Sequence, residues 1–161
     1  MTAARQLDIA IDVEAADWPP VHELETILDR VVAACFAELG LDPVQPSELG
    51  VTFTDDAHIA ELNRHWRSKD GATNVLSFPV VEIAPGTELP PMLGDIVIAF
   101  ETVAREAREQ EKPFIDHLTH LLAHGLLHLV GYDHMDDDEA ETMEALERRI
   151  LERLAIPDPY A

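Results

Sequence analysis

Residues 124–134 read H-G-L-L-H-L-V-G-Y-D-H, and the rest of the chain is organised around this stretch. His124 and His128 are four residues apart in an apolar segment typical of a helix, so they share one face, about 40° apart. Two imidazoles in this arrangement can bind one metal ion from consecutive turns. We predict that the helix ends at Gly131, because glycine adopts the left-handed conformation without steric cost. The chain then turns back and can bring His134 to the same ion.

Three imidazoles that leave one coordination position open are typical of a catalytic zinc site, because a structural zinc ion takes four protein ligands. We therefore predict one zinc ion per chain, bound by His124, His128 and His134. The spacing H-x-x-x-H-x-x-G-x-x-H is also that of the metzincin proteases. Those proteases carry a glutamate as general base directly after the first histidine, where this chain has Gly125. A metallopeptidase is therefore disfavoured, and a helix with solvated histidines is the alternative without a metal.

The composition is typical of one folded domain. A chain of 161 residues, 47% of them apolar, is long enough for a sizeable core, and we treat residues 1–161 as a single domain. The one cysteine, Cys35, cannot form an internal disulfide, and its apolar surroundings in the sequence favour a buried position. The first residues, M-T-A-A-R-Q-L-D-I, lack the apolar segment of a signal peptide. No stretch approaches the ~20 apolar residues of a membrane span, so we expect a cytoplasmic protein without a membrane partner.

The charge argues against nucleic-acid binding. With 32 acidic residues against 11 Lys and Arg, the formal net charge is −21 at pH 7. Most nucleic-acid-binding proteins are basic, because phosphate contacts supply much of their affinity. We therefore expect no DNA partner, and RNA binding only if the few cations cluster or a metal ion or protein partner compensates. Arg64, Arg67 and Lys69 form one such cluster; an arginine near a metal can hold a phosphate, although cations also suit a helix end.

The periodicity of apolar residues predicts an α+β fold with a mixed sheet of about four strands and about five helices. Alternating or continuous apolar runs indicate strands over residues 7–14, 49–54, 73–83 and 93–99. Helical spacing indicates helices over residues 21–39, 56–67, 101–111, 113–130 and 138–154. Pro79 suggests an edge strand or a bulge, whereas the continuous run over residues 93–99 suggests a strand buried on both faces.

Several side chains near the histidine motif are further candidates. His117 and His120 precede His124 on the same arc of the helix, either as hydrogen-bonded or solvent-facing side chains or as contacts to substrate or ligands. Asp133, beside His134, could orient a ligand imidazole or accept a proton in place of the missing glutamate. The acidic run over residues 136–139 could bind metal, but carboxylates at a helix start more often cap free N–H groups.

The sequence resembles the YbeY-type endoribonucleases, which are also called rRNA maturation factors. The resemblance rests on the histidine motif and on L-N-R-H-W-R-S-K-D-G-A-T-N-V-L-S-F-P at residues 62–79. L-G-D-I at residues 93–96 and D-P-Y at residues 158–160 support it. It extends from about residue 49 to the C-terminus. Asn74 stands where many members of the family have Asp and others have Asn.

The resemblance implies a small α+β domain with the metal site on a central helix, and zinc bound by His124, His128 and His134. Arg67 would be the functional arginine beside the metal. Lys69, in the basic cluster, and His117 and His120, on the helix arc, are candidate substrate contacts from their positions in the sequence. The implied activity is metal-dependent, single-strand-specific RNA cleavage in the 3′-end maturation of small-subunit rRNA and in ribosome quality control. The implied partners are the small ribosomal subunit, a ribosomal protein and the GTPase Era.

A mechanism follows from these roles. Zinc would lower the pKa of a bound water, and that water or the RNA's own 2′-hydroxyl would attack while Arg67 neutralises the phosphate. Two alternatives stay open: a zinc metallopeptidase, against which Gly125 argues, and a non-catalytic, zinc-stabilised ribosome assembly factor, which suits the charge of −21 better.

Overall fold

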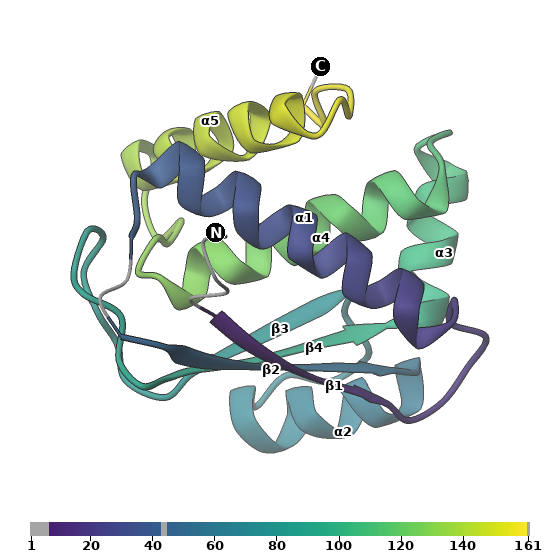
Figure 1. Ribbon diagram of the computed structural model, residues 1–161. Coiled ribbons are helices and arrows are strands. Elements are labelled where there is room, and N and C mark those ends of the chain that lie inside the picture. Colours follow the sequence, from purple (N-terminus) through teal and green to yellow (C-terminus); the bar gives the residue numbers. More distant parts are fainter. Residues whose placement is uncertain (1–6, 43–44, 161) are drawn as a thin grey trace.

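Four strands form one mixed sheet in the computed structural model, which describes residues 7–42 and 45–160 (Figure 1). Their order across the sheet is β1-β2-β4-β3. Neighbours β1, β2 and β4 run parallel, whereas β3 lies antiparallel to β4 at one edge. The bounds of the strands are Leu7–Val13 for β1, Ser47–Thr54 for β2, Val75–Pro79 for β3 and Met92–Ala99 for β4.

Five helices in the described ranges cover the sheet unequally (Figure 1). Helices α1 and α4 lie over one face, α5 packs on α1 and α4 from outside, and α2 alone covers the opposite face. Helix α3 packs beside α4. The bounds are Val21–Leu39 for α1, Asp56–Arg67 for α2, Phe100–Glu109 for α3, Phe114–Leu129 for α4 and Asp137–Arg153 for α5.

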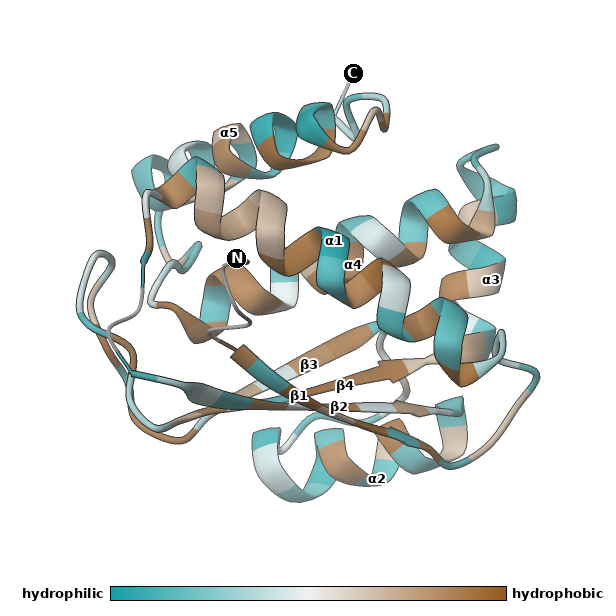
Figure 2. Ribbon diagram, viewed as in Figure 1, coloured by the Kyte–Doolittle hydropathy of each residue, from teal (hydrophilic) through white to brown (hydrophobic). Residues whose placement is uncertain are grey.

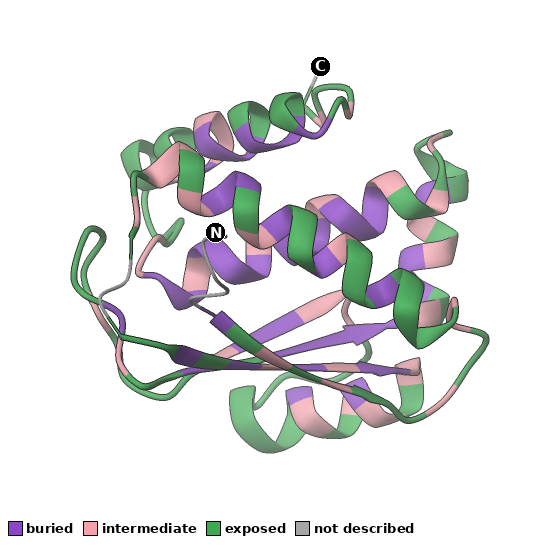
Figure 3. Cartoon of the chain, viewed as in Figure 1, coloured by how far each residue is buried: buried purple, intermediate pink, exposed green. Residues whose placement is uncertain are grey.

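Helix α4 is the central helix because it is apolar on nearly every side. Ten of its sixteen residues are buried, and it touches the sheet, α1, α3 and α5. Figures 2 and 3 show the contrast with α2, which is largely hydrophilic and exposed. The main core accordingly lies between the sheet and α1, α4 and α5, with a smaller cluster of Ile59, Leu76, Val97 and Ala99 under α2. A helix enclosed in this way holds its side chains in fixed positions.

Local signals place the helix ends. Gly40 ends α1 in the left-handed conformation, as the sequence predicts. The side chain of Asp55 caps α2 by accepting a hydrogen bond from the N–H of His58 at 2.9 Å. Asp136 caps α5 in the same way, accepting from the N–H of Glu139 at 2.8 Å. Capping is therefore the observed role of Asp136 at the start of the acidic run.

The predicted α+β fold is confirmed, but the strand expected over residues 73–83 is too long. Only Val75–Pro79 forms β3. Pro79 has no N–H to donate, and the ladder stops after Val80 donates to the carbonyl of Leu93 at 3.2 Å. The edge position that Pro79 predicts is confirmed. The predicted burial of β4 on both faces is confirmed too, because its residues belong both to the main core and to the cluster under α2. Within the described ranges, no helix has both the length and the apolar character needed to cross a membrane.

Candidate metal centre

Helix α4 and the turn after it bring three histidines together. His124 and His128 lie on consecutive turns of α4, with their Nε2 atoms 3.2 Å apart. The helix ends at Leu129, and Gly131 adopts φ 113° while Tyr132 N–H donates to the carbonyl of Leu127 at 3.0 Å. This turn brings His134 beside the other two rings, whose centroids lie 5.6 and 4.9 Å from its own.

Gly131 is required for this turn. A Cβ atom at this position would lie 2.6 Å from the carbonyl oxygen of Ile83, closer than real Cβ contacts allow. Its φ is also one that L side chains rarely adopt. The helix stop that the sequence predicts at Gly131 is therefore confirmed, and it has a steric reason outside the helix.

The three histidines could hold a metal ion. One nitrogen from each lies within 4.8 Å of the others. In a tetrahedral zinc site with Zn–N distances of about 2.0–2.1 Å, two ligand nitrogens stand about 3.3 Å apart. The separation of 3.2 Å between His124 and His128 matches that spacing. The donor set therefore fits a divalent ion that prefers imidazole ligands.

Glu147 of α5 fixes the tautomer of His124. Burial by itself raises the pKa of Glu147, but hydrogen bonds from His120, His124 and Tyr160 outweigh it and lower this pKa to about 2. The ionised carboxylate can only accept, so the Nδ1–H of His124 donates to its Oε2 at 2.8 Å. In the neutral form of His124, which is the form that binds metal, the unprotonated nitrogen is therefore Nε2, and this atom faces His128.

His128 stays neutral at acidic pH. Burial, and then the charges that His124 and His134 would carry, lower its pKa from 6.5 to about 4, although Asp133 opposes this shift. Neutral imidazole is the form that binds metal. Protons therefore compete weakly with a metal ion for this ligand.

Asp133 lies at the exposed side of the centre. Its Oδ1 accepts a hydrogen bond from the N–H of His134 at 2.8 Å and lies 3.8 Å from Nδ1 of His128. The longer distance is an electrostatic contact rather than a hydrogen bond. The side chain is 48% exposed and lines the cleft that holds the three histidines.

The structure explains why position 125 carries glycine where a metzincin has its base. Gly125 is buried against the sheet, and a Cβ atom there would lie 3.2 Å from both Ile96 Cδ1 and Ser77 Oγ. Ser77 Oγ also donates to the carbonyl of Gly125 at 3.3 Å. A glutamate at this position would enter the packed layer between α4 and the sheet, so it could not serve the metal centre without disrupting that layer.

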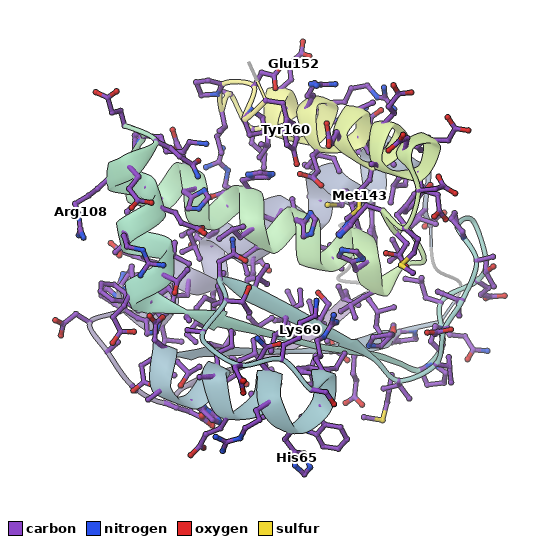
Figure 4. All side chains as sticks on the ribbon, turned by 180° about the vertical axis from the view of Figure 1, so that it is seen from behind. His65, Lys69, Arg108, Met143, Glu152 and Tyr160 are labelled. Carbon is purple, nitrogen blue, oxygen red and sulfur yellow. The ribbon has the colours of Figure 1, made fainter. Side chains whose placement is uncertain are left out.

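A cleft of about 780 Å³ contains the three histidines together with Arg67 and Lys69. Arg67 ends α2 but reaches round the edge strand, where its Nη2 donates to the carbonyl of Ser77 at 3.2 Å. Figure 4 labels Lys69 on the side of α4 that faces the sheet. Among the described residues, neither cation has an ion-pair partner within 4.0 Å. Arg64 is exposed and does not line this cleft.

A second cavity of about 730 Å³ shares Asn74, Val75 and His124 with the first and is lined by His117 and His120. His117 is only 3% exposed, and its Nε2 contacts Glu106 Oε1 at 2.8 Å. His120 contacts Glu147 through its Nε2 at 2.5 Å. Both therefore adopt the hydrogen-bonded arrangement that the sequence left open. Carboxylates line the same cavity, so these two histidines are poorly placed to bind a phosphate group.

Glu147, the buried partner of His124, was not among the site residues predicted from the sequence. One signal was available: Glu147 falls on the same face of its helix as Met143 and Ile150, both buried, so it is an acidic residue in an apolar stripe. Glu106 was not predicted either; it accepts a hydrogen bond from the amide of Asn74 at 2.9 Å and pairs with His117. No local pattern indicated that contact.

The family comparison and the similar curated proteins carry one description. The family described as "Endoribonuclease YbeY" matches residues 10–155. "Endoribonuclease YbeY" of Rhizobium meliloti (strain 1021) is 57% identical over 159 residues, 96% of this chain and 95% of the relative. The protein of that name from Agrobacterium fabrum is 55% identical over 160 residues, with the same coverage.

A solved structure, the solution structure of TM1509 from Thermotoga maritima, has a similar fold. It superposes with a TM-score of 0.57 at 23% identity, covering 92% of this chain and 91% of the other. At that identity the likeness supports the fold alone. The family match and the closely similar relatives go further: this chain belongs to the endoribonuclease YbeY family.

Proposed function

We propose that this protein is a metal-dependent endoribonuclease that cuts single-stranded RNA and acts in 3′-end maturation of small-subunit rRNA. The observation that carries the proposal is the joint placement of His124, His128 and His134 with Arg67 and Lys69 in one cleft. The family of the chain supports RNA as the substrate. A role in ribosome quality control, with the small subunit, a ribosomal protein and the GTPase Era as partners in the cytoplasm, rests on the family resemblance alone.

Zinc is the metal we propose, held by the three histidines. The all-imidazole donor set suits zinc, and three protein ligands leave a position for substrate or solvent. When bound, the ion would act as a Lewis acid toward a phosphoryl oxygen or a water molecule. The tautomer of His124 set by Glu147 supports this ligand set.

The chain's own residues would bind the phosphate and move the proton. The guanidinium of Arg67 and the ammonium of Lys69 line the histidine cleft without carboxylate partners among the described residues, so they can neutralise charge that develops on the scissile phosphate. Asp133 lines the same cleft and is half exposed, which suits it to accept the proton of the attacking hydroxyl. That hydroxyl belongs to water or to the RNA 2′ position.

The test is cleavage of a single-stranded RNA by tag-free protein beside His128→Ala purified identically. We expect cleavage by the wild type alone, and equal cleavage by both would indicate a contaminating nuclease. Product ends identify the nucleophile, because a 2′,3′-cyclic phosphate requires attack by the 2′-hydroxyl. Absence of cleavage of both free RNA and small ribosomal subunits would overturn the proposal in favour of a non-catalytic assembly factor. Casein cleavage that a chelator abolishes would instead indicate a peptidase.

A further inference from the structure

Glu147 is a buried carboxylate with three donors around it. The residue is 1% exposed and lies on the core-facing side of α5. Its Oε2 accepts from His124 Nδ1 at 2.8 Å, while its Oε1 contacts His120 Nε2 at 2.5 Å and accepts from the hydroxyl of Tyr160 at 2.6 Å. One oxygen therefore serves the metal-site histidine alone, and the other is held by two groups outside the centre.

Stability alone does not explain this arrangement. A buried carboxylate is costly, and replacing a buried ionic cluster with well-packed apolar residues is often neutral or stabilising. The neighbouring residues of the α5 stripe, Met143, Leu146 and Ile150, are apolar and buried. A carboxylate in their midst is explained by what it does to His124: it fixes the orientation of the ring.

Tyr160 is itself anchored by the D-P-Y segment. Its N–H donates to Asp158 Oδ1 at 2.8 Å, and the same carboxylate pairs with Arg148 Nε at 3.3 Å. The guanidinium of Arg148 lies 5.3 Å from the centre of the Tyr160 ring. Figure 4 labels Tyr160 on the α5 side of α4, away from Lys69. The Tyr160 backbone is thus held by Asp158, its ring lies against Arg148 of α5, and its hydroxyl reaches Glu147.

We propose that Glu147 and Tyr160 are positioning residues for the metal site: Tyr160 holds the carboxylate of Glu147, which holds His124 with Nε2 turned toward His128 and His134. The inference rests on the metal site of the proposed function. It assigns a role to the D-P-Y segment, none of whose residues lies among the three proposed ligands. Partners of this kind typically change metal affinity 10- to 100-fold when removed.

The first variant is Glu147→Gln. The carboxamide has nearly the same shape, but its N–H₂ group faces either His124 or both His120 and Tyr160, and it lacks the negative charge, so it holds His124 less firmly. We expect the dissociation constant for zinc to rise by about 10- to 100-fold. We also expect a changed visible absorption spectrum of the Co²⁺-loaded protein, since that spectrum reports ligand geometry. Tyr160→Phe removes one hydrogen bond and should weaken zinc binding several-fold in the same direction.

The matched control is Glu106→Gln. Glu106 also pairs with a histidine of α4, His117, at 2.8 Å, but that histidine is not a proposed ligand. We expect its zinc affinity and Co²⁺ spectrum to equal those of the wild type. Zinc affinity is measured by competition with a chelator, and thermal unfolding of each metal-free variant reports any general loss of stability.

Each outcome decides the inference. Unchanged zinc affinity and Co²⁺ spectrum in Glu147→Gln would overturn it, as would an equal loss in Glu106→Gln. If Glu147→Gln does not fold, Tyr160→Phe decides, because it deletes a single hydroxyl from a residue that is 40% exposed. A wild type that binds zinc but cleaves no RNA would overturn the proposed function and leave this inference standing. A wild type that binds no zinc would overturn both.

Discussion

We expect Arg67 to bind the phosphate of the RNA without binding the metal, so a substitution there separates the two roles. Its side chain enters the histidine cleft but is held by the carbonyl of Ser77 rather than by a ligand. We expect Arg67→Ala to lower RNA cleavage by about 10²- to 10³-fold, the cost of removing one preorganised charge donor, while zinc affinity stays unchanged. Cleavage kinetics measure the expected loss of activity, and zinc titration checks that the zinc affinity is unchanged.

Arg64→Ala is the control for that variant. Arg64 belongs to the same helix, is exposed and does not line the cleft, so its loss should leave cleavage nearly unchanged. Loss of zinc from Arg67→Ala would contradict the division of roles between the arginine and the histidines. An equal loss of activity in both variants would mean that the general charge of α2, rather than the position of Arg67, matters.

His128 gives the metal-free protein a defined pH dependence. Its pKa is about 4 in the folded state and about 6.5 when exposed, so between these values the unfolded chain binds more protons and stability rises with pH. Stability from this residue is complete above pH 6.5 and is lost as the pH falls toward 4. The full loss is on the order of 3 kcal/mol.

Denaturant unfolding of the metal-free wild type and of His128→Asn at pH 7 and pH 4.5 measures this contribution. Asparagine does not titrate, so the variant should lose less stability than the wild type over this range. Equal losses in the two proteins would show that other groups cause the acid sensitivity and that His128 titrates normally.

The residues that the sequence could reveal are those that a local pattern brings together. The histidines lie within eleven residues, so helix geometry and one glycine were enough to predict their convergence, which is confirmed. Glu147 meets His124 across 23 residues and two helices, and its pairing depends on how α5 packs on α4. The one sequence signal for Glu147 was an acidic residue within the apolar stripe of α5.

Asp136, at the start of α5, can distinguish the two interpretations of the acidic run over residues 136–139, which are helix capping and metal binding. The side chain of Asp136 caps the helix through the N–H of Glu139, at 2.8 Å. We expect Asp136→Ala to lower the free energy of unfolding by about 1 kcal/mol and to leave zinc affinity unchanged. Asp137→Ala, which removes a first-turn charge but not the cap, should cost less. Denaturant unfolding and zinc titration of both variants make the comparison.

A fall in zinc affinity in Asp136→Ala with unchanged stability would revive the metal-binding alternative for this run.

The ends of helices and the ends of strands differ in how well the sequence predicts them. Helix starts and stops depend on a few adjacent residues, and those were predicted to within one or two positions. Strand ends depend on a partner, so the sequence could not show that β3 loses its ladder with β4 beyond Pro79.

At the scale of the whole molecule, net charge was a poor guide to function because it ignores where the charges lie. The formal charge of −21 favoured a protein without nucleic-acid partners, yet the chain belongs to an endoribonuclease family. Three arginines of α5 are engaged in ion pairs with Glu38 and Asp158: Arg148, Arg149 and Arg153. Arg67 and Lys69 have no such partner among the described residues and lie in the cleft. RNA affinity should therefore arise from a few cations.

This distribution predicts an unusually weak salt dependence of RNA binding. For single strands, the slope of log K against log salt concentration is about −0.7 per neutralised phosphate, so two cations give about −1.4. Screening of the repulsion between RNA and the acidic surface makes the slope shallower still. Fluorescence anisotropy of a labelled single-stranded RNA, with metal-free protein to prevent cleavage, measures it at several salt concentrations.

Lys69→Gln should reduce that slope by about 0.7, because it removes one phosphate contact. Arg149→Gln is the control, since this arginine is already paired with Glu38 at 2.7 Å and lies outside the cleft. A wild-type slope steeper than about −4 would require more phosphate contacts than the cleft cations can make. It would point to another basic surface or a partner as the source of affinity. An unchanged slope in Lys69→Gln would mean that this lysine makes no phosphate contact, and Arg67 would then be the phosphate contact of the cleft.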